Sequence, residues 1–197
     1  MRIKSHWHKS DKPRSMQQTA SVMAFIIWRL AQNALKRMRT EQYDIDPGQQ
    51  YFAFLSELLV FLIQIADRIA YQKLDAAQRS EFTTALAIRI AEILDDNQSD
   101  LMGRLQAGSY KGRFIALLNE LSADYAEFEY TTAGPDFAFL RYLGSRVMET
   151  MVQKDRHWVI DQIMAIEAPE AVADVQKGMR SLLDMIETGS SVPGNSA

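Results

Sequence analysis

The chain of 197 residues contains no cysteine, and it has only three histidines, five prolines and nine glycines. Without thiols the protein forms no disulfide, no thiolate nucleophile, and no zinc or iron-sulfur site held by cysteine. Disulfides are rare in the cytosol, so we expect a cytoplasmic protein. The low proline and glycine content leaves few helix breakers and favours helical structure.

No stretch of the sequence is long and apolar enough to cross a bilayer. The most apolar segment, YFAFLSELLVFLIQIADRIA at residues 51–70, has an uncharged run of nine residues, 58–66, whereas a membrane span needs about 20. We therefore predict no membrane span. The basic residues 1–14 and the apolar residues after them imitate the start of a secretory signal. Arg29 interrupts that apolar part without a cleavage pattern, so we do not expect export.

Motifs that mark common catalytic and metal sites are also missing. There is no glycine-rich phosphate loop, no nucleophile elbow and no zinc-binding helix motif. A carboxylate-bridged di-iron bundle needs Glu-x-x-His on two helices, and that pattern does not occur. We therefore predict no bound metal and no cofactor, and we expect the acidic residues of the middle helices to face solvent. These residues are Glu57, Glu92, Glu120 and Glu149.

Charge is distributed unevenly along the chain, although the net charge is only −3. Residues 1–40 hold nine lysines or arginines and one acidic residue, whereas the remainder holds thirteen basic and twenty-four acidic residues. Domains that bind nucleic acid are usually basic overall, so we do not expect nucleic acid as a partner. The basic start contacts either an anionic partner or the acidic surface of the protein itself, and both alternatives stay open.

Apolar residues recur at helical spacing through most of the chain, and no internal repeat or alternating strand pattern is present. The capping signals that mark where helices begin are Ser15 with Gln18, Asp46 with Pro47 and Gln49, and Asp75 with Gln78. The predicted helices cover residues 15–39, a segment from Pro47, and residues 75–97, 111–128 and 135–151, with a sixth from Asp155. Pro169 predicts either a kink or the start of a seventh helix, which ends near Glu187.

The predicted fold is therefore all-α: one single-domain bundle of about six to seven helices over residues 15–187. A basic N-terminal arm, residues 1–14, precedes the bundle. Residues 188–197 form a tail whose composition is typical of disorder.

Two of the predicted helices are apolar beyond a single face. In the helix around residues 51–70, Val60 and Phe61 spread toward the side of the polar residues. In the helix of residues 15–39, Val22 and Phe25 share the outer side with Arg29. Such helices lie deep in a bundle or form a second interface. We predict a homodimer through these four apolar residues, unless the last two helices of the same chain cover them.

Aromatic residues concentrate around one predicted turn, in DYAEFEYTTAGPDFAFLRYLGSR at residues 124–146. Aromatic side chains beside arginine are common at interaction hot spots and stack on planar ligands, but they also fill protein cores. If the protein has a ligand or partner site, we expect it at this corner. The candidate residues are Tyr125, Phe128, Tyr130, Phe137, Phe139, Arg141, Tyr142 and Arg146.

The sequence assigns no catalytic residue. His157 and Asp161 are four residues apart and share a helical face, but no nucleophile accompanies them, so a surface hydrogen bond is the simpler interpretation. We expect a non-enzymatic helical-bundle protein that binds or regulates through protein-protein contacts with an unidentified partner. The alternative is a small-molecule-binding or catalytic bundle with an apolar pocket near residues 125–146. A filled aromatic corner favours the first, whereas an enclosed pocket with a buried carboxylate and arginine favours the second.

Overall fold

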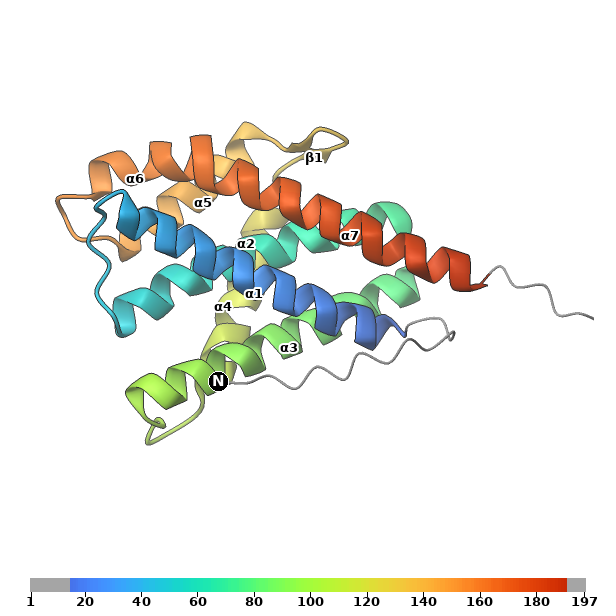
Figure 1. The fold of residues 1–197 in the computed structure, drawn as a ribbon, viewed down its shortest axis with the longest axis horizontal. Coiled ribbons are helices and arrows are strands. Elements are labelled where there is room, and N and C mark those ends of the chain that lie inside the picture. Colours follow the sequence, from blue (N-terminus) through green and yellow to red (C-terminus); the bar gives the residue numbers. More distant parts are fainter. Residues whose placement is uncertain (1–14, 191–197) are drawn as a thin grey trace, which may run out of the picture.

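The computed structural model describes residues 15–190, with side chains up to residue 185, and it is an all-α bundle (Figure 1). The predicted arm, residues 1–14, and residues 191–197 of the predicted tail lie outside this range. The helices are α1 (Met16–Thr40), α2 (Gln49–Lys73), α3 (Ala76–Met102), α4 (Tyr110–Ala126), α5 (Phe137–Thr150), α6 (Arg156–Gln162) and α7 (Ala168–Ser190). A π-helix, Ile163–Glu167, joins α6 to α7, and two-residue strands β1 (Tyr130–Thr131) and β2 (Gly134–Pro135) pair antiparallel. The predicted fold class is confirmed.

Two of the three predicted helix starts are confirmed by their capping contacts. The side chains of Ser15 and Asp75 each accept a hydrogen bond from the backbone N–H of the glutamine three residues later. The side-chain oxygen of that glutamine accepts in turn from the backbone N–H of the capping residue. The start predicted at Pro47 is wrong. The second helix begins after Gly48, whose φ of 128° lies in the left-handed region, and the amide oxygen of Gln50 accepts from the backbone N–H of Asp46 instead (2.8 Å).

Proline residues mark helix boundaries less directly than the sequence suggests. Pro135 lies in β2, and the fifth helix begins two residues later, where Asp136 accepts from the N–H of Phe139 (2.7 Å). Pro169 is the second residue of α7, so the predicted start of a seventh helix at this proline is confirmed to within one residue. A proline blocks the hydrogen bond to the carbonyl four residues earlier, and the chain widens into the π-helix just before Pro169. In that π-helix the N–H of Ala168 donates to the carbonyl of Ile163.

The third helix runs to Met102, beyond its predicted end at residue 97, and the loop before α4 shrinks accordingly. The first turn of α4 contacts α3 through Lys111. The backbone N–H of Lys111 donates to Asp95 (2.9 Å), and the side-chain ammonium of Lys111 donates to Glu92 (3.1 Å). Gly103, with φ of 81°, then ends α3. Both acidic partners lie before residue 97, so these contacts position α4 against the predicted part of α3, and the helix itself continues to Met102.

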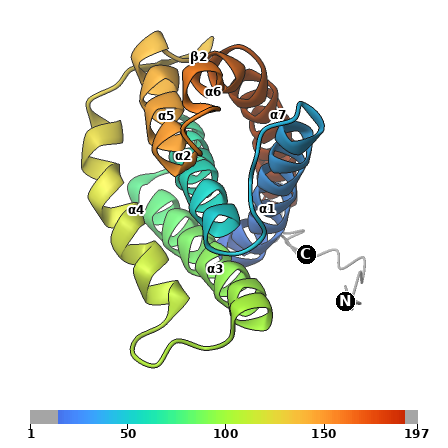
Figure 2. The ribbon, with the colours of Figure 1, turned by 90° about the vertical axis from the view of Figure 1, so that its left-hand side faces the viewer.

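The central element of the bundle is α2, which packs against α1, α3, α4, α5 and α7 (Figure 2). Val60 and Phe61 are fully buried within the chain, where the ring of Phe61 lies 5.6 Å from that of Phe139. The expectation that they lie at an outer interface is therefore wrong. Val22 is half-buried and Phe25 is 43% exposed on α1, with the guanidinium of Arg29 over the Phe25 ring.

The polar side of α2 faces other helices rather than solvent. Glu57 is only 5% exposed and binds the guanidinium of Arg146 on α5, so the expectation that it faces water is wrong. Gln64 donates to Ser122 on α4, and Asp67 accepts from Arg79 on α3. A helix surrounded by neighbours satisfies its polar groups through those neighbours. This row of contacts fixes how α3, α4 and α5 are placed over α2.

Candidate functional site

The aromatic corner predicted as a site is filled by its own rings. Tyr125 and Phe139 are fully buried, and Phe128 and Tyr142 are half-buried against them. The centroid of the Tyr125 ring lies 4.9 Å from those of Phe139 and Tyr142 and 6.3 Å from that of Phe128. Edge and tilted contacts at these separations are typical of aromatic cores. These four rings pack against one another between α4 and α5 instead of enclosing a ligand.

The other four predicted residues lie apart from these rings. Phe137 is 70% exposed at the start of α5, and Arg141 is exposed one turn later. Tyr130 turns toward α7, where its hydroxyl accepts from Gln176 (3.1 Å). The guanidinium of Arg146 forms the ion pair with Glu57. The eight residues therefore do not form one surface, and their use by a partner stays a prediction.

Burial strongly shapes the electrostatics of this corner. The hydrogen bond from Arg146 to Glu57 (2.7 Å) raises the pKa of the guanidinium above its ordinary value. Burial raises the pKa of Tyr142, whose hydroxyl donates to Asp124, and it raises the pKa of Tyr125 further. Both phenols therefore stay protonated over a wider pH range than in water. The pair of Glu57 and Arg146 is a structural clamp between α2 and α5.

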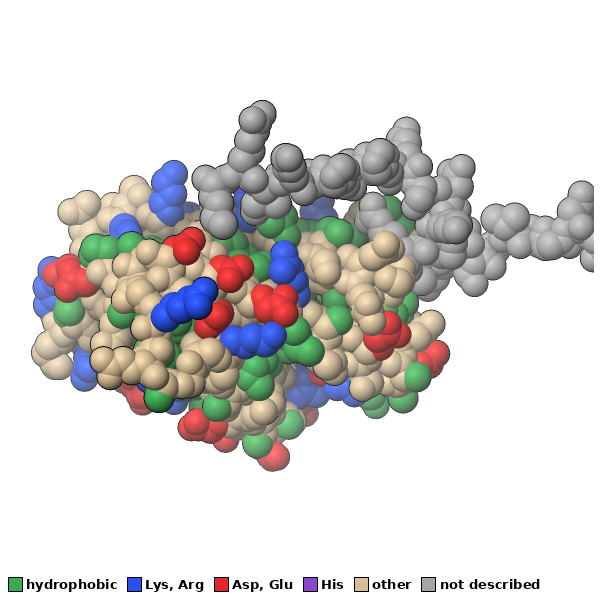
Figure 3. All heavy atoms as spheres, turned by 90° about the horizontal axis from the view of Figure 1, so that it is seen from below, with side chains coloured by type: hydrophobic (Ala, Val, Ile, Leu, Met, Phe, Trp, Pro, Cys, Tyr) green, Lys and Arg blue, Asp and Glu red, His purple; other side chains and the backbone are tan. Residues whose placement is uncertain are grey.

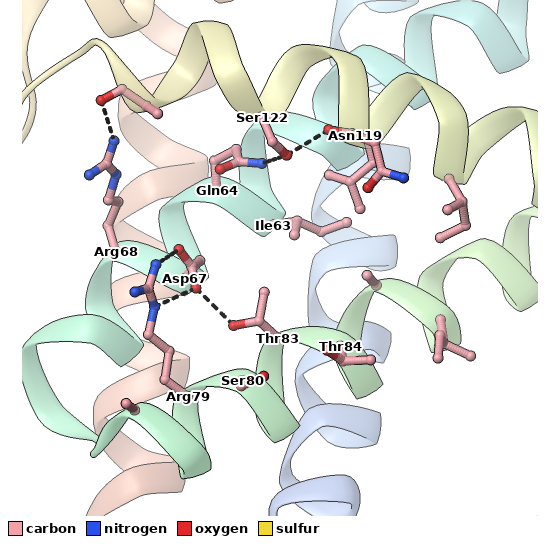
Figure 4. Close-up of a pocket in the computed structure, with 16 residues that line it drawn as sticks. Ile63, Gln64, Asp67, Arg68, Arg79, Ser80, Thr83, Thr84, Asn119 and Ser122 are labelled. Carbon is pink, nitrogen blue, oxygen red and sulfur yellow. Dashed lines mark hydrogen bonds and ion pairs between the residues drawn. The ribbon is translucent and has the colours of Figure 1, made fainter.

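A groove on another face of α2 is the strongest candidate for a functional site (Figure 4). The fourth helix crosses over α2 and α3 and leaves a hollow of about 680 Å³ beside it. We call this hollow the α3/α4 groove. The floor of the groove is formed on α2 by Ile63, Gln64, Asp67 and Arg68. One wall is formed on α3 by Ala76, Arg79, Ser80, Thr83, Thr84, Ala87 and Ile88. The other wall is formed on α4 by Ile115, Leu118, Asn119, Ser122 and Ala126.

The local sequence explains why the groove stays open. On α3 the lining positions recur every three or four residues, which places them along one helical face. Most of that wall consists of small side chains, chiefly alanine, serine and threonine. Such side chains are too short to reach the opposite helix, so the two walls stand apart over α2. A stripe of small residues on an otherwise amphipathic helix was the available sequence signal for this site.

One end of the groove is charged and already organised. Asp67 accepts from Arg79 through both oxygens (2.5 and 2.9 Å) and from the hydroxyl of Thr83 (2.8 Å). This pairing raises the pKa of Arg79, whose guanidinium also lies 4.9 Å from the centre of the Tyr71 ring. Arg68 donates to the carbonyl of Tyr125 (2.9 Å) at the end of α4. A cation at a helix C-terminus is favourable, so Arg68 also caps α4.

The other end of the groove is apolar, and its middle is polar. The apolar end contains Ile88, which is 41% exposed, together with Ile115 on the facing helix. In the middle, Ser80, Thr84 and Asn119 are exposed, and within residues 15–185 their side chains make no hydrogen bond. The groove therefore offers free hydrogen-bonding groups between an apolar end and a charged end.

Nothing in the described part of the chain assembles a metal centre or a membrane span. Among residues 15–185, no three histidine, aspartate or glutamate side chains lie close enough to hold a metal ion. Within the same part of the chain, no helix combines the length and the apolar character that crossing a bilayer requires. His157 makes no hydrogen bond to Asp161; its ring instead lies edge-on to that of Trp158, at 4.9 Å.

Comparisons of the chain with protein-family models, with curated proteins and with solved structures find no significant match.

Proposed function

We propose that the protein is a non-enzymatic binding protein whose α3/α4 groove receives one helix of a partner protein. The observation that carries the proposal is the shape of the groove, which is open along its length and lined on both walls at helical spacing. Recognition of an amphipathic helix in a groove between helices is a common mode of protein-protein binding.

The length of the groove suits a helix of about three turns. Its lining runs from Ala76 to Ile88 on α3 and from Ile115 to Ala126 on α4, which at 1.5 Å per residue is about 17 Å. An extended peptide would need backbone partners, and helical walls present side chains instead. A helix satisfies its own backbone, so it is the occupant that such walls favour.

The side chains define what the partner helix carries. Apolar residues one turn apart suit the end with Ile88 and Ile115, and a carboxylate suits the end with Arg68 and Arg79. Polar residues between them can bond to Thr84 and Asn119. The charged end is only weakly selective, because Arg79 is already paired with Asp67.

The alternative, a small-molecule-binding or catalytic bundle at residues 125–146, has less support. A buried carboxylate and an arginine are present there, as Glu57 and Arg146, but each satisfies the other. The aromatic rings beside them fill the corner. Within the described residues, neither Glu57 nor Arg146 is therefore left free to receive a substrate.

Two further elements of the proposal concern assembly and location. A homodimer remains a proposal that now rests on Val22 and Phe25 alone, since their predicted companions on α2 are buried. Light scattering gives the molar mass of the wild type and of Phe25→Glu and so tests the homodimer. A wild type that is monomeric at about 50 µM would rule the homodimer out. A cytoplasmic location remains a proposal based on the lack of cysteine.

A selection experiment tests the groove. A display library of helical peptides about 14 residues long is selected against the full chain, and its binders are titrated against two variants. Thr84→Arg places a long side chain across the groove. Ala116→Arg places the same side chain at an exposed position of α4 outside the lining. We expect micromolar binders that Thr84→Arg weakens at least about tenfold and Ala116→Arg leaves unchanged. Binders that ignore Thr84→Arg would contradict the proposal.

A further inference from the structure

Three segments that are distant in the sequence enclose a second, smaller pocket of about 320 Å³. They are the end of α2, the β1–β2 hairpin and α7, and Figure 1 shows the hairpin beside α7. The hairpin is held there by the hydrogen bond from Gln176 to Tyr130. Gly134, the first residue of β2 with φ of 116°, lies close to Val172 and Gln176. This pocket does not depend on the α3/α4 groove.

Cationic side chains reach the pocket from two helices. Lys73 is the last residue of α2, where the helix dipole alone explains a cation. Arg180 lies inside α7, away from either helix end, so the dipole does not explain it. The lining contains one carboxylate, that of Asp184, which is itself engaged in an interaction. Two cations against one carboxylate leave the pocket with an excess of positive charge.

The hairpin adds neutral hydrogen-bond donors. The hydroxyl of Tyr130 accepts from Gln176, so its own proton is available for donation into the pocket. Burial raises the pKa of Tyr130, which keeps that proton in place at neutral pH. The hydroxyl of Thr132 has no hydrogen-bond partner within residues 15–185. Charged and neutral donors together are what an oxyanion requires.

The rest of the lining contains two polar residues, Gln72 and Thr131, and two apolar residues, Ile69 and Leu183. Together with the half-buried ring of Tyr130, the two aliphatic side chains give the pocket apolar walls. Small-molecule sites commonly combine apolar walls with a few convergent polar groups, in volumes from about 300 Å³ upward. A bare inorganic ion would leave these apolar walls without contact.

We propose that this pocket binds a small organic phosphate monoester, with its phosphate between Lys73, Arg180 and the hairpin hydroxyls. The organic part packs against Ile69, Leu183 and the ring of Tyr130. Inorganic phosphate shares the anion chemistry and lacks this apolar contact.

Titration calorimetry at constant ionic strength tests the proposal, with phenyl phosphate, inorganic phosphate and phenol as probes. We expect phenyl phosphate to bind with a Kd of about 1 mM or lower, at least about threefold tighter than inorganic phosphate, and phenol not to bind. The double variant Lys73→Gln/Arg180→Gln should lose about tenfold or more. Lys177→Gln removes the same charge from an exposed position of α7 outside the lining, and it should leave binding unchanged.

Other results would overturn the proposal. They are no saturation by phenyl phosphate at about 10 mM, an equal loss in Lys177→Gln, or inorganic phosphate binding as tightly as the monoester. Backbone NMR of the wild type decides the case even if the double variant fails to fold. Shifts on addition of phenyl phosphate should map to residues 130–132, Lys73 and Arg180, and shifts elsewhere would contradict the site.

Discussion

Two hydroxyl groups, those of Thr19 and Tyr125, are fully buried without a hydrogen-bond partner among residues 15–185. A buried polar group in this state costs about 1 to 3 kcal/mol relative to a satisfied one. The ring of Tyr125 nevertheless makes extensive contacts with its aromatic neighbours. Its hydroxyl therefore weakens a core that its ring stabilises.

Replacement of this hydroxyl should stabilise the protein. We expect Tyr125→Phe to raise the free energy of unfolding by about 1 kcal/mol, because the ring contacts remain and the unsatisfied group is removed. The matched variant Tyr142→Phe loses a hydrogen bond to Asp124 and should lower it by about 1 kcal/mol. Urea denaturation compares the two. Equal effects of the same sign would show that the two hydroxyls are not in different environments.

The raised pKa values of Tyr125 and Tyr142 predict a loss of stability at alkaline pH. Burial raises the folded-state pKa of Tyr125 and Tyr142, so the unfolded chain ionises first, near pH 10. This contribution is complete below that pH and declines as the pH rises further toward the folded-state values. We expect the free energy of unfolding to fall between about pH 9.5 and 11, less steeply in Tyr125→Phe. Urea titrations at stepped pH measure it, and parallel curves would contradict the expectation.

The buried ion pair between α2 and α5 should behave asymmetrically on mutation. We expect Arg146→Met to lower the free energy of unfolding by about 3 kcal/mol, because it leaves the carboxylate of Glu57 buried without its partner. Adding Glu57→Leu to this variant should restore most of the loss, since apolar replacement of a buried pair is often neutral. Thermal denaturation of both variants checks this. A double variant less stable than the single one would contradict it.

At the scale of elements, two glycines inside helices lie at helix crossings that differ in how closely the helices approach. A Cβ at Gly144 on α5 would lie 3.1 Å from Cγ2 of Ile160 on α6, closer than a relaxed contact. A Cβ at Gly178 on α7 would meet Ile26 and Met23 of α1 at ordinary distances, from 3.5 Å. The crossing of α5 and α6 therefore needs its glycine, and the crossing of α1 and α7 does not.

These two positions give a matched prediction. We expect Gly178→Ala to raise the free energy of unfolding by about 0.5 to 1 kcal/mol, because alanine is the better helix former. The identical substitution at Gly144 should lower it by about 1 kcal/mol, because the branched side chain of Ile160 has little freedom to move away. Chemical denaturation measures both. A gain in stability at Gly144 would mean that α6 shifts readily.

Local signals predicted the elements well and their contacts poorly. The capping pairs at Ser15 and Asp75 located two helices, because each pair acts within one turn. The contact of α4 with α3 depends on Lys111, sixteen residues after its partner Asp95, and no local pattern reports it. The α3/α4 groove was missed for the same reason, since it exists only where α4 crosses α3. The prediction that Glu57 faces solvent was wrong because helical periodicity identifies the polar side of a helix. It does not show whether that side faces solvent or a neighbouring helix.

At the scale of the whole molecule, charge is more mixed than its order along the chain suggests. Of the four cations on α1, Arg37 binds the buried Glu167 (2.6 Å) and Arg39 donates to the carbonyl of Ile45. Among the side chains described up to residue 185, Arg29, Lys36 and Arg39 make no ion pair, although Arg39 is satisfied by that carbonyl. On the face shown in Figure 3, acidic and basic side chains lie among one another. Helix packing therefore pairs one of the four cations of α1 with an acidic residue and gives a second a backbone partner.

The central position of α2 determines how the chain comes apart. Five helices from both halves of the sequence, α1, α3, α4, α5 and α7, lie against it, so each of them loses part of its apolar cover once α2 leaves. The backbone amides of α2 should then exchange with deuterium only when the entire molecule opens, at one common free energy. The β1–β2 hairpin, with a single short ladder, should exchange orders of magnitude faster. Native-state hydrogen exchange would reveal a gradient along α2 if the bundle opened in parts, so uniform protection there is the mark of a single cooperative unit.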